Sequence, residues 1–239
     1  MKAIKQWRPS KFLLQKNALK IGPALPPHSW IMGDLLGKIY SKTIKEYVKG
    51  VLIDLGCGNA PLYVLYRYYA DEIICVDWQK STHDTIHADL FCDLNSEIAL
   101  ADQSADTILC TDVIEHLYHP HKLFSEISRI LIPGGKAIIG TPFLYWLHEE
   151  PHDYFRYSPF ILKHLCDQHQ LKIIRLEAYG GSIHVFLDMI VKHFSFSKVC
   201  SKIIAWLCRM ILYVPGIAKL SDKTAKKFPL GHILVTERR

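Results

Sequence analysis

A ten-residue stretch, residues 51–60, constrains the fold of this chain more than any other segment. It reads V-L-I-D-L-G-C-G-N-A, with Asp54 inside an apolar run and Gly56 and Gly58 one residue apart. A short apolar run that ends in glycines is typical of a buried strand that breaks into a tight turn. Glycine suits such a turn because it adopts positive φ and lets a ligand approach the backbone. A segment able to begin a helix follows, so the stretch predicts the strand, turn and helix with which open α/β sheets cradle a nucleotide-like ligand.

Details of this stretch narrow the choice of ligand. A dinucleotide fingerprint would need a third glycine at position 61, where Pro61 stands, and no lysine follows at the spacing of a phosphate-binding loop. Asp54 would repel a pyrophosphate and suits a ligand that carries positive charge. Glycine turns also form for packing alone, so the ten residues by themselves leave both a structural and a ligand-binding interpretation open.

Length and cysteine usage set the class of protein. The 239 residues, 49% of them hydrophobic, are enough for one large α/β domain with an insertion. Seven cysteines occur without a C-x-x-C pair, and no N-terminal apolar run resembles a signal peptide. We therefore expect a reducing, cytoplasmic environment.

The positive charge is concentrated in two segments. Residues 1–20 contain six lysines and arginines and no acid, and residues 182–230 contain eight against two aspartates, whereas the middle of the chain is acidic overall. This pattern does not favour a general nucleic-acid binder. Basic segments with apolar content suit an anionic membrane surface, and ordinary solubilising charge is the alternative.

Alternating apolar runs and helical patterns predict parallel strands joined by helices. A basic, proline-rich arm at 1–28 precedes a domain at 29–239, and residues 182–230 form an insertion with two amphipathic helices within 183–218. No uncharged apolar run in this insertion approaches the ~20 residues that cross a bilayer. The expected strands are 51–55, 72–77, 86–90, 105–110, 136–142, 171–176 and 231–236. The expected helices outside the insertion are 29–49, about 61–70, 120–130 and 159–169.

Acids end two of the expected strands. Asp77 follows Gly58 by nineteen residues, a position suited to accepting hydrogen bonds from ribose hydroxyls, although a turn aspartate is the simpler alternative. Asp89 closes the third expected strand, where it could accept a hydrogen bond from an adenine amino group.

Taken in order, these motifs resemble the class I S-adenosylmethionine-dependent methyltransferases of the small-molecule type with a D-x-G-C-G loop. The resemblance covers about residues 48–180 and the last strand. It is carried by the segments 54–58, 76–77, 88–90, 106, 111–117 and 131–135. Residues 148–158 resemble a stretch found in bacterial members that are linked to glycan or lipid-linked sugar pathways.

The resemblance implies a Rossmann-like α/β fold. Its seven-stranded sheet has the order 3-2-1-4-5-7-6, with the last strand antiparallel, helices on both faces and the insertion between strands 6 and 7. The implied cofactor is S-adenosylmethionine, with Asp54 near its amino group and Gly56 and Gly58 against its methionine part. The implied cofactor-binding residues are Asp54, Gly56, Cys57, Gly58, Asp77, Trp78, Asp89, Leu90 and Thr111. Pro61 is a departure from the family pattern, because it stiffens the turn that leads into the first helix.

The expected reaction is an in-line methyl transfer from the sulfonium to an acceptor, most simply a hydroxyl of a glycan or lipid-linked sugar. A positioned general base would accelerate it roughly 10²–10⁴-fold. The candidate catalytic residues are His116, His148 and His152, with Glu149 and Asp153 as further base candidates. Glu149, Asp153, Tyr154 and Arg156 are the candidate substrate contacts, and a surface ion pair of Arg156 with Glu149 or Glu150 is the alternative. We predict no metal site, since Pro151 interrupts a helical pairing of His148 with His152.

Several roles remain open for the insertion at 183–218: a lid over the substrate, peripheral contact with a membrane, or the face of a homodimer. Two functions also remain open. One is methylation of a small-molecule or lipid-linked acceptor, and the other is a non-catalytic, cofactor-binding partner protein at the membrane. Pro61 disfavours a dehydrogenase.

Overall fold

The computed structural model describes residues 7–81 and 83–239. Residues 1–6 of the expected N-terminal arm lie outside the described residues. The strands are β1 (Phe12–Gln15), β2 (Ala18–Ile21), β3 (Val51–Leu55), β4 (Glu72–Asp77), β5 (Leu90–Phe91), β6 (Ala105–Thr111), β7 (Leu131–Pro142), β8 (Leu171–Tyr179) and β9 (Gly231–Arg238). The α-helices are α1 (Trp30–Tyr47), α2 (Tyr63–Tyr66), α3 (Pro120–Ile130), α4 (Pro159–Gln168), α5 (Ser182–His193), α6 (Lys198–Tyr213) and α7 (Ile217–Asp222), with two 3₁₀ turns, η1 (Pro27–Ser29) and η2 (Ile114–His116).

Seven of the strands form one mixed sheet in the order β5-β4-β3-β6-β7-β9-β8. The neighbours from β5 to β7 pair in parallel, and β9 pairs antiparallel with both β7 and β8. This is the expected order 3-2-1-4-5-7-6 with an antiparallel last strand, so the predicted fold class is confirmed.

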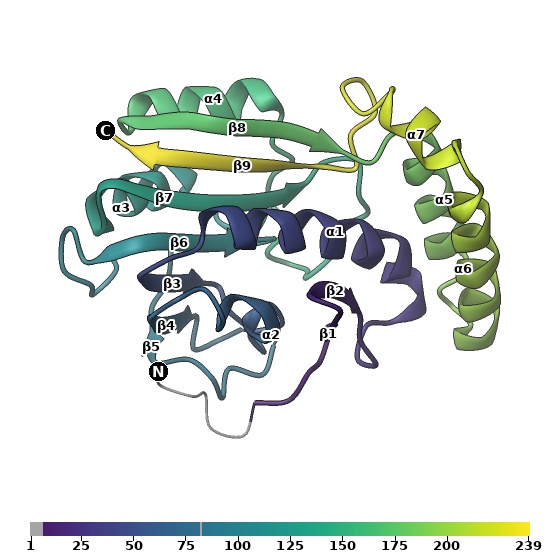
Figure 1. Cartoon of the computed structure of the whole chain (residues 1–239), viewed down its shortest axis with the longest axis horizontal. Coiled ribbons are helices and arrows are strands. Elements are labelled where there is room, and N and C mark those ends of the chain that lie inside the picture. The colour runs from purple at the N-terminus through teal and green to yellow at the C-terminus, as the bar shows by residue number, and fades with distance from the viewer. Residues whose placement is uncertain (1–6, 82) are drawn as a thin grey trace.

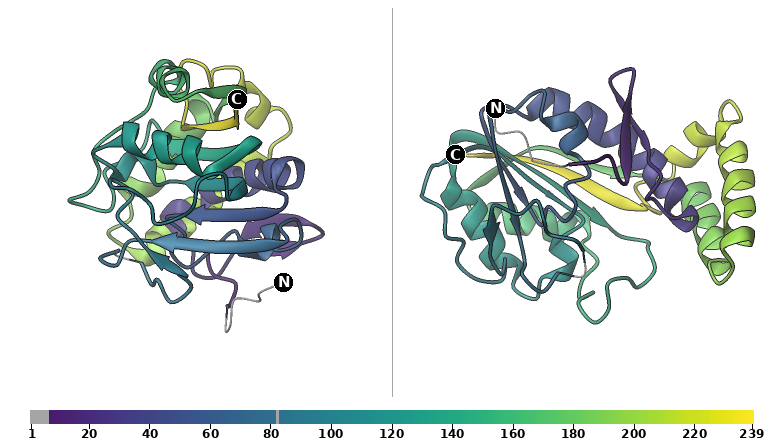
Figure 2. Two further views of the ribbon diagram at one scale, coloured as in Figure 1. Left: turned by 90° about the vertical axis from the view of Figure 1, so that its left-hand side faces the viewer. Right: turned by 90° about the horizontal axis from the view of Figure 1, so that it is seen from below.

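Alternate residues of the central strands face two separate hydrophobic layers. Leu52 of β3 and Leu109 of β6 belong to the cluster that packs against α1 and α2. Their neighbours Ile53 and Ile108 belong to the cluster that contains the apolar sides of α3 and α4. Because side chains alternate along a strand, each strand supplies both layers, and helices cover both faces of the sheet (Figure 2).

Two additions gather at the carboxyl ends of the parallel strands. The hairpin β1–β2 lies against α1, where the Leu19 amide donates to the Ser41 hydroxyl over 2.7 Å. The helices α5, α6 and α7 extend beyond the same edge of the sheet (Figure 1). The insertion thus holds three helices rather than two, since α6 ends at Tyr213 and Gly216, at φ +94°, redirects the chain into α7.

Two elements near the ligand-binding edge are shorter than expected. The helix after β3 has four residues, because hydrogen bonds spanning three residues, such as Tyr68 N to the Leu65 carbonyl, break the α-helical pattern. The third strand of the sheet, β5, begins at Leu90, so Asp89 precedes the strand instead of closing it.

Candidate functional site

The turn after β3 is fixed to the neighbouring strand through its backbone. The amides of Gly56 and Cys57 donate to the Val76 carbonyl over 2.8 and 3.1 Å. Gly56 has φ +73°, and a Cβ atom built on it would lie 2.4 Å from Cγ2 of Val113. Glycine is therefore required at this position both by the backbone conformation and by the close approach of Val113.

Asp77 ends β4 beside this turn and is almost fully buried, with 5% of its surface exposed. One carboxylate oxygen accepts from the Gly58 amide over 2.5 Å, and the other accepts from the Trp78 amide over 2.6 Å. A single carboxylate thus orders the glycine turn and faces the ligand-binding edge of the sheet.

Two adjoining cavities, of about 210 and 220 Å³, open at this edge. The residues that line both are Gly56, His83, Asp112, His116 and Glu149. An elongated ligand could therefore occupy the second cavity and extend into the first.

The second cavity is lined by residues that follow two neighbouring strands. Asp77 and Trp78 follow β4, Asp93 and Leu94 follow β5, and Val113 adds apolar surface. Asp89 and Leu90 line neither cavity, and the Asp89 carboxylate instead accepts from the Cys75 amide over 3.1 Å. Asp93, four residues after Asp89, is an acid that lines the second cavity.

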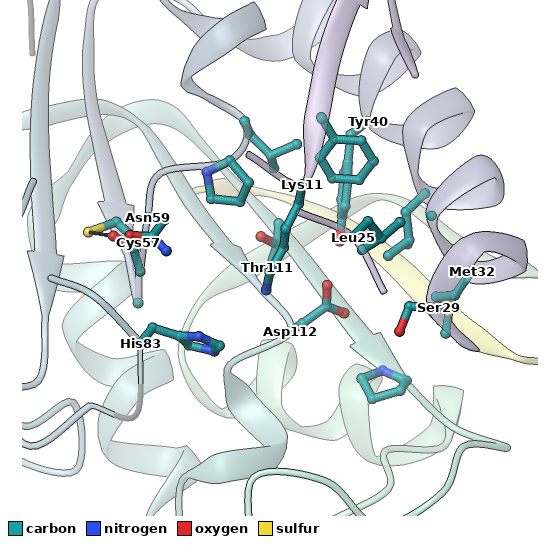
Figure 3. Close-up of a pocket in the computed structure, with 18 of the residues that line it drawn as sticks. Lys11, Leu25, Ser29, Met32, Tyr40, Cys57, Asn59, His83, Thr111 and Asp112 are labelled. Atoms are coloured by element: carbon teal, nitrogen blue, oxygen red, sulfur yellow. Dashed lines mark hydrogen bonds between the residues drawn. The ribbon is translucent and has the colours of Figure 1, made fainter. Parts of the chain in front are cut away.

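The first cavity is bordered by strand ends, α1 and the N-terminal hairpin. Asp54 and Thr111 come from β3 and β6, and Tyr40 comes from α1. Lys11 comes from the residue before β1, and Figure 3 shows it directed toward the same space as Thr111 and Asp112. Burial raises the pKa of Asp112, while the positive charge of Lys11 opposes that shift.

Asp54 is the buried carboxylate of this cavity, and it accepts a hydrogen bond from the Tyr66 hydroxyl over 2.9 Å. Burial raises its pKa from 3.8 to about 7, the hydrogen bond from Tyr66 lowers it, and the charge of Asp77 adds to the rise. Between pH 3.8 and about pH 7, Asp54 therefore keeps a proton in the folded chain that it has lost in the unfolded chain.

We predict that this proton makes the stability of wild type relative to Asp54→Asn fall as pH rises from about 4 to about 7. The folded state binds more protons in that range, so the slope of the unfolding free energy is negative, at most about 1.4 kcal/mol per pH unit. The slope vanishes above the folded pKa, where both states are ionised. Chemical denaturation of both proteins at pH 5, 6, 7 and 8 measures the difference, and parallel stability profiles would contradict it.

A polar cluster formed by η2 and the loop after β7 lies at one end of the first cavity. The Nε2 atoms of His116 and His148 each lie 3.8 Å from the same oxygen, Oε1 of Glu115. Burial raises the pKa of Glu115 well above its usual range, and the nearby Asp112 adds to the shift. His116 lines both cavities and His148 lines the first.

His152, the third predicted catalytic residue, lies at the second cavity, away from His116 and His148. Its ring packs edge to face on Trp78 with the ring centroids 5.3 Å apart, and its Nδ1 lies 3.1 Å from the Tyr154 hydroxyl. It lines the second cavity but not the first. The structure thus brings His116 and His148 together and places His152 at the second cavity.

The predicted substrate contacts divide in the same way. Glu149 lines both cavities and pairs with His83 at 2.6 Å, and Tyr154 lines the second cavity. Asp153 and Arg156 line neither, because the Arg156 guanidinium donates to both carboxylate oxygens of Asp153 over 2.5 and 2.7 Å. Although burial opposes it, hydrogen bonds from Arg156 and the His148 amide lower the pKa of Asp153 to about 2. The Asp153–Arg156 ion pair therefore holds together the loop after β7.

The residues of the site that the sequence did not single out include Lys11, Tyr40, His83, Asp93, Asp112 and Glu115. Asp112 and Glu115 stand within the segment 111–117, which was identified as a motif, so their position carried a signal. Lys11 and Tyr40 carried none, because they reach the cavity only through the packing of the hairpin and α1 against the sheet.

Comparison with known proteins agrees with this geometry. The family model described as "Methyltransferase domain" matches residues 53–139. A probable S-adenosylmethionine-dependent methyltransferase of Mycolicibacterium smegmatis is 30% identical over 109 residues, which cover 44% of this chain and 42% of that protein. The ubiquinone biosynthesis O-methyltransferase of Pasteurella multocida is 25% identical over 151 residues, covering 54% of this chain and 60% of that protein. The chain thus spans about half the length of the curated relatives that it matches.

Solved structures share the fold at low identity. The phosphoethanolamine N-methyltransferase 2 of Haemonchus contortus, solved with S-adenosylmethionine, superposes with a TM-score of 0.54 at 16% identity and covers 89% of this chain and 56% of that one. The [4+2]-cyclase SpnF superposes with a TM-score of 0.56 at 13% identity over 96% of this chain and 87% of that one. Residues 53–139 thus match a methyltransferase domain, and the chain is similar to class I S-adenosylmethionine-dependent methyltransferases in this part of its sequence and in the order of its sheet.

Proposed function

We propose that this protein transfers the methyl group of S-adenosylmethionine to a hydroxyl of a glycan or lipid-linked sugar. The observation that carries the proposal is the pair of cavities that meet at Gly56, Asp112 and His116. A donor whose adenosine part lies in the second cavity can reach an acceptor in the first cavity only where the two cavities share walls.

The second cavity suits the adenosine part of the donor. Asp77 would accept hydrogen bonds from the ribose hydroxyls, and Trp78 would pack against the adenine. Asp93 would accept from the adenine amino group, with the Leu94 backbone beside a ring nitrogen. Asp89 and Leu90, which the sequence favoured for these contacts, lie outside the cavities.

The first cavity suits the methionine part and the acceptor. Asp54 and Asp112 would attract the ammonium group, and Lys11 the carboxylate, while the backbone of Gly56 to Gly58 lies close to both. The transfer itself forms a C–O bond as the S–C bond breaks, and the sulfur leaves as a neutral thioether. The protein contributes mainly by holding the oxygen in line with the methyl group, and such orientation can supply about 7–11 kcal/mol of the barrier.

The proposed acceptor rests on two observations. Polar side chains that can hydrogen-bond a hydroxylated molecule border the first cavity, among them Ser29, His148 and Glu149. One relative is named as an O-methyltransferase, which supports oxygen as the atom that is methylated. A non-catalytic cofactor-binding partner protein is the alternative, and it would bind the cofactor without consuming it.

Calorimetric titration tests the donor. We expect S-adenosylmethionine to bind at one site per chain and NAD to show no binding. Asp93→Asn is expected to weaken S-adenosylmethionine binding about tenfold, since it removes one charge-assisted hydrogen bond of about 1.5 kcal/mol. Asp89→Asn is the matched control, because Asp89 begins the same Asp-Leu pair four residues earlier. It is expected to leave the affinity for S-adenosylmethionine within a factor of two of wild type. Equal losses in both variants would overturn the assignment of Asp93, and NAD binding without S-adenosylmethionine binding would overturn the proposed donor.

We also propose that α6 rests on an anionic membrane surface, which would bring a lipid-linked acceptor near the cavity. One side of α6, with Ser201, Ala205 and Cys208, is buried against the rest of the chain. The opposite side exposes a second apolar face made of Val199, Ile203, Trp206, Leu207 and Met210. Lys198 and Lys202 fall between the two faces, and the insertion is strongly basic, so an anionic lipid surface complements both its charge and its apolarity. In the described residues no helix is long and apolar enough to cross a membrane.

Flotation on vesicles of anionic phospholipid tests this contact. We expect the protein to float with the vesicles and Ile203→Glu/Trp206→Glu to lose at least about 90% of that binding, because about 1.5–3 kcal/mol is lost for each apolar side chain withdrawn from the lipid. Phe160→Glu is the matched control, since Phe160 is 76% exposed on α4 and is expected to leave flotation unchanged. Wild-type protein that stays in the soluble fraction and elutes as a dimer would show that a second copy covers the face instead.

A further inference from the structure

Glu115 holds a buried carboxylate oxygen that has no hydrogen-bond partner among the described residues. Its side chain is fully buried, and its Oε2 accepts from the Thr141 hydroxyl over 3.3 Å. Within the described part of the chain, Oε1 accepts no hydrogen bond. A buried polar atom left in this way costs about 1–3 kcal/mol or more for a charged group, so an occupant that satisfies it is expected.

Two imidazoles converge on that oxygen. Nε2 of His116 and Nε2 of His148 are both 3.8 Å from Oε1, and all three atoms lie within 4.8 Å of one another. The amides of Tyr154 and Phe155 donate to the Glu115 carbonyl over 2.9 and 3.2 Å, which ties η2 to the loop that carries His148. The convergence is therefore built by two chain segments held together by backbone hydrogen bonds.

The far side of each imidazole is held by an acceptor. Nδ1 of His116 lies 2.8 Å from the His152 carbonyl. Nδ1 of His148 lies 3.3 Å from a carboxylate oxygen of Asp153, whose own position is fixed by Arg156. Donation from Nδ1 to these acceptors leaves a lone pair on each Nε2, and both lone pairs belong to the side that faces Glu115. Histidines that ligate metals are oriented by this kind of partner.

We propose that Glu115, His116 and His148 bind one divalent first-row transition-metal ion such as Zn²⁺. Two histidines and one carboxylate with open positions are a ligand set of catalytic zinc and non-haem iron sites. Ligand atoms about 2.1 Å from an ion lie roughly 3–3.5 Å apart. The pairs now 3.8 Å apart need to close by about 0.3–0.8 Å, and a pair at the 4.8 Å limit needs to close by about 1.3–1.8 Å. The sequence analysis predicted no metal site, because the only pair of ligands that it considered was His148 with His152.

The site has a consequence for the acceptor, and this step rests on the proposed function. His116 and His148 line the first cavity, so an ion that they hold would be accessible from it. An acceptor hydroxyl bound there releases its proton to solvent more readily, as metal-bound water does. The resulting oxygen attacks the methyl carbon, the S–C bond breaks, and the donor leaves as its neutral thioether. The substrate class is accordingly an acceptor with a hydroxyl that can ligate a metal ion.

The test is a Zn²⁺ titration of the full chain, freed of metal and competed against a chromophoric chelator. Cys200 is an exposed thiol that could bind Zn²⁺ by itself, so all proteins carry Cys200→Ser. We expect one ion per chain, at least a 100-fold loss of affinity in Glu115→Gln and in His148→Ala, and unchanged binding in His121→Ala. The last variant is the matched control, because His121 belongs to the surface pair with His169 at 3.3 Å. Co²⁺ should give visible ligand-field bands that disappear in His148→Ala.

Absence of a bound ion, or equal affinity in wild type and His148→Ala, would overturn the site. Thermal melting of the metal-free variants separates loss of a ligand from loss of the fold, and His116→Ala is a second ligand variant if Glu115→Gln does not fold. Calorimetry with S-adenosylmethionine on the metal-free protein separates the two proposals. Donor binding without metal binding refutes the ion alone, and metal binding without donor binding refutes the proposed function alone.

Discussion

Asp77→Ala is expected to weaken S-adenosylmethionine binding by at least about 100-fold, the largest effect of any single substitution in the donor site. The change removes the carboxylate that would accept from the ribose hydroxyls, where charged hydrogen bonds contribute about 1.5–3 kcal/mol each. It also frees the amides of Gly58 and Trp78, which that carboxylate now holds. Calorimetry on wild type and variant measures the ratio of dissociation constants.

The control for Asp77→Ala is Asp71→Ala, which removes an exposed acid just before β4. Its donor affinity should match that of wild type. Circular dichroism and thermal melting of ligand-free Asp77→Ala show whether the turn still folds. A folded variant that keeps wild-type affinity would refute the placement of the ribose beside Asp77.

Gly56→Ala is expected to destabilise the protein by about 2–5 kcal/mol and to weaken donor binding, though less than Asp77→Ala does. A left-handed backbone conformation costs a residue with a Cβ roughly 1–2 kcal/mol, and overpacking against Val113 adds about 1–3 kcal/mol. Val113, which the new methyl group would displace, lines the second cavity, so the donor site is disturbed as well. Denaturant unfolding measures the stability, and calorimetry measures the binding.

The chain offers a matched control for this substitution. Gly134 has φ +76°, almost the same as Gly56, but a Cβ built on it meets no atom within 4 Å. Gly134→Ala should therefore show the conformational cost alone, about 1–2 kcal/mol, with normal donor binding. Equal effects of the two substitutions would mean that the contact with Val113 contributes nothing.

The central sheet could be predicted because its signals are local. Apolar runs, glycine turns and the acids that follow them fix β3, β4, β6 and the crossovers, and the resemblance supplied the strand order. The third strand was misplaced because Asp-Leu occurs twice, at 89–90 and at 93–94. Only the pairing of Leu90 with Val76 shows which of the two follows the strand.

The polar end of the first cavity was harder to predict, because it depends on contacts between distant segments. Glu115 is an acid that a helical or loop pattern would place in solvent, yet it is fully buried under residues 148–156. Arg156 resembled an anion-binding residue but pairs with Asp153, three residues away, so neither side chain reaches the cavity. Lys11 arrives from a hairpin that the sequence presented only as a basic arm. These positions follow from tertiary packing rather than from local pattern.

The proposed function depends most directly on whether the methyl group leaves the donor. The protein is incubated with S-adenosylmethionine labelled in its methyl group and with glycan and lipid extracts of the cells that produce it, and the products are separated by mass spectrometry. We predict that one acceptor class gains a single labelled methyl group while S-adenosylhomocysteine accumulates in equal amount, and that Asp77→Ala gives neither product. A wild-type protein that binds the donor at one site per chain but leaves it intact with every extract would contradict methyl transfer and favour the non-catalytic partner protein.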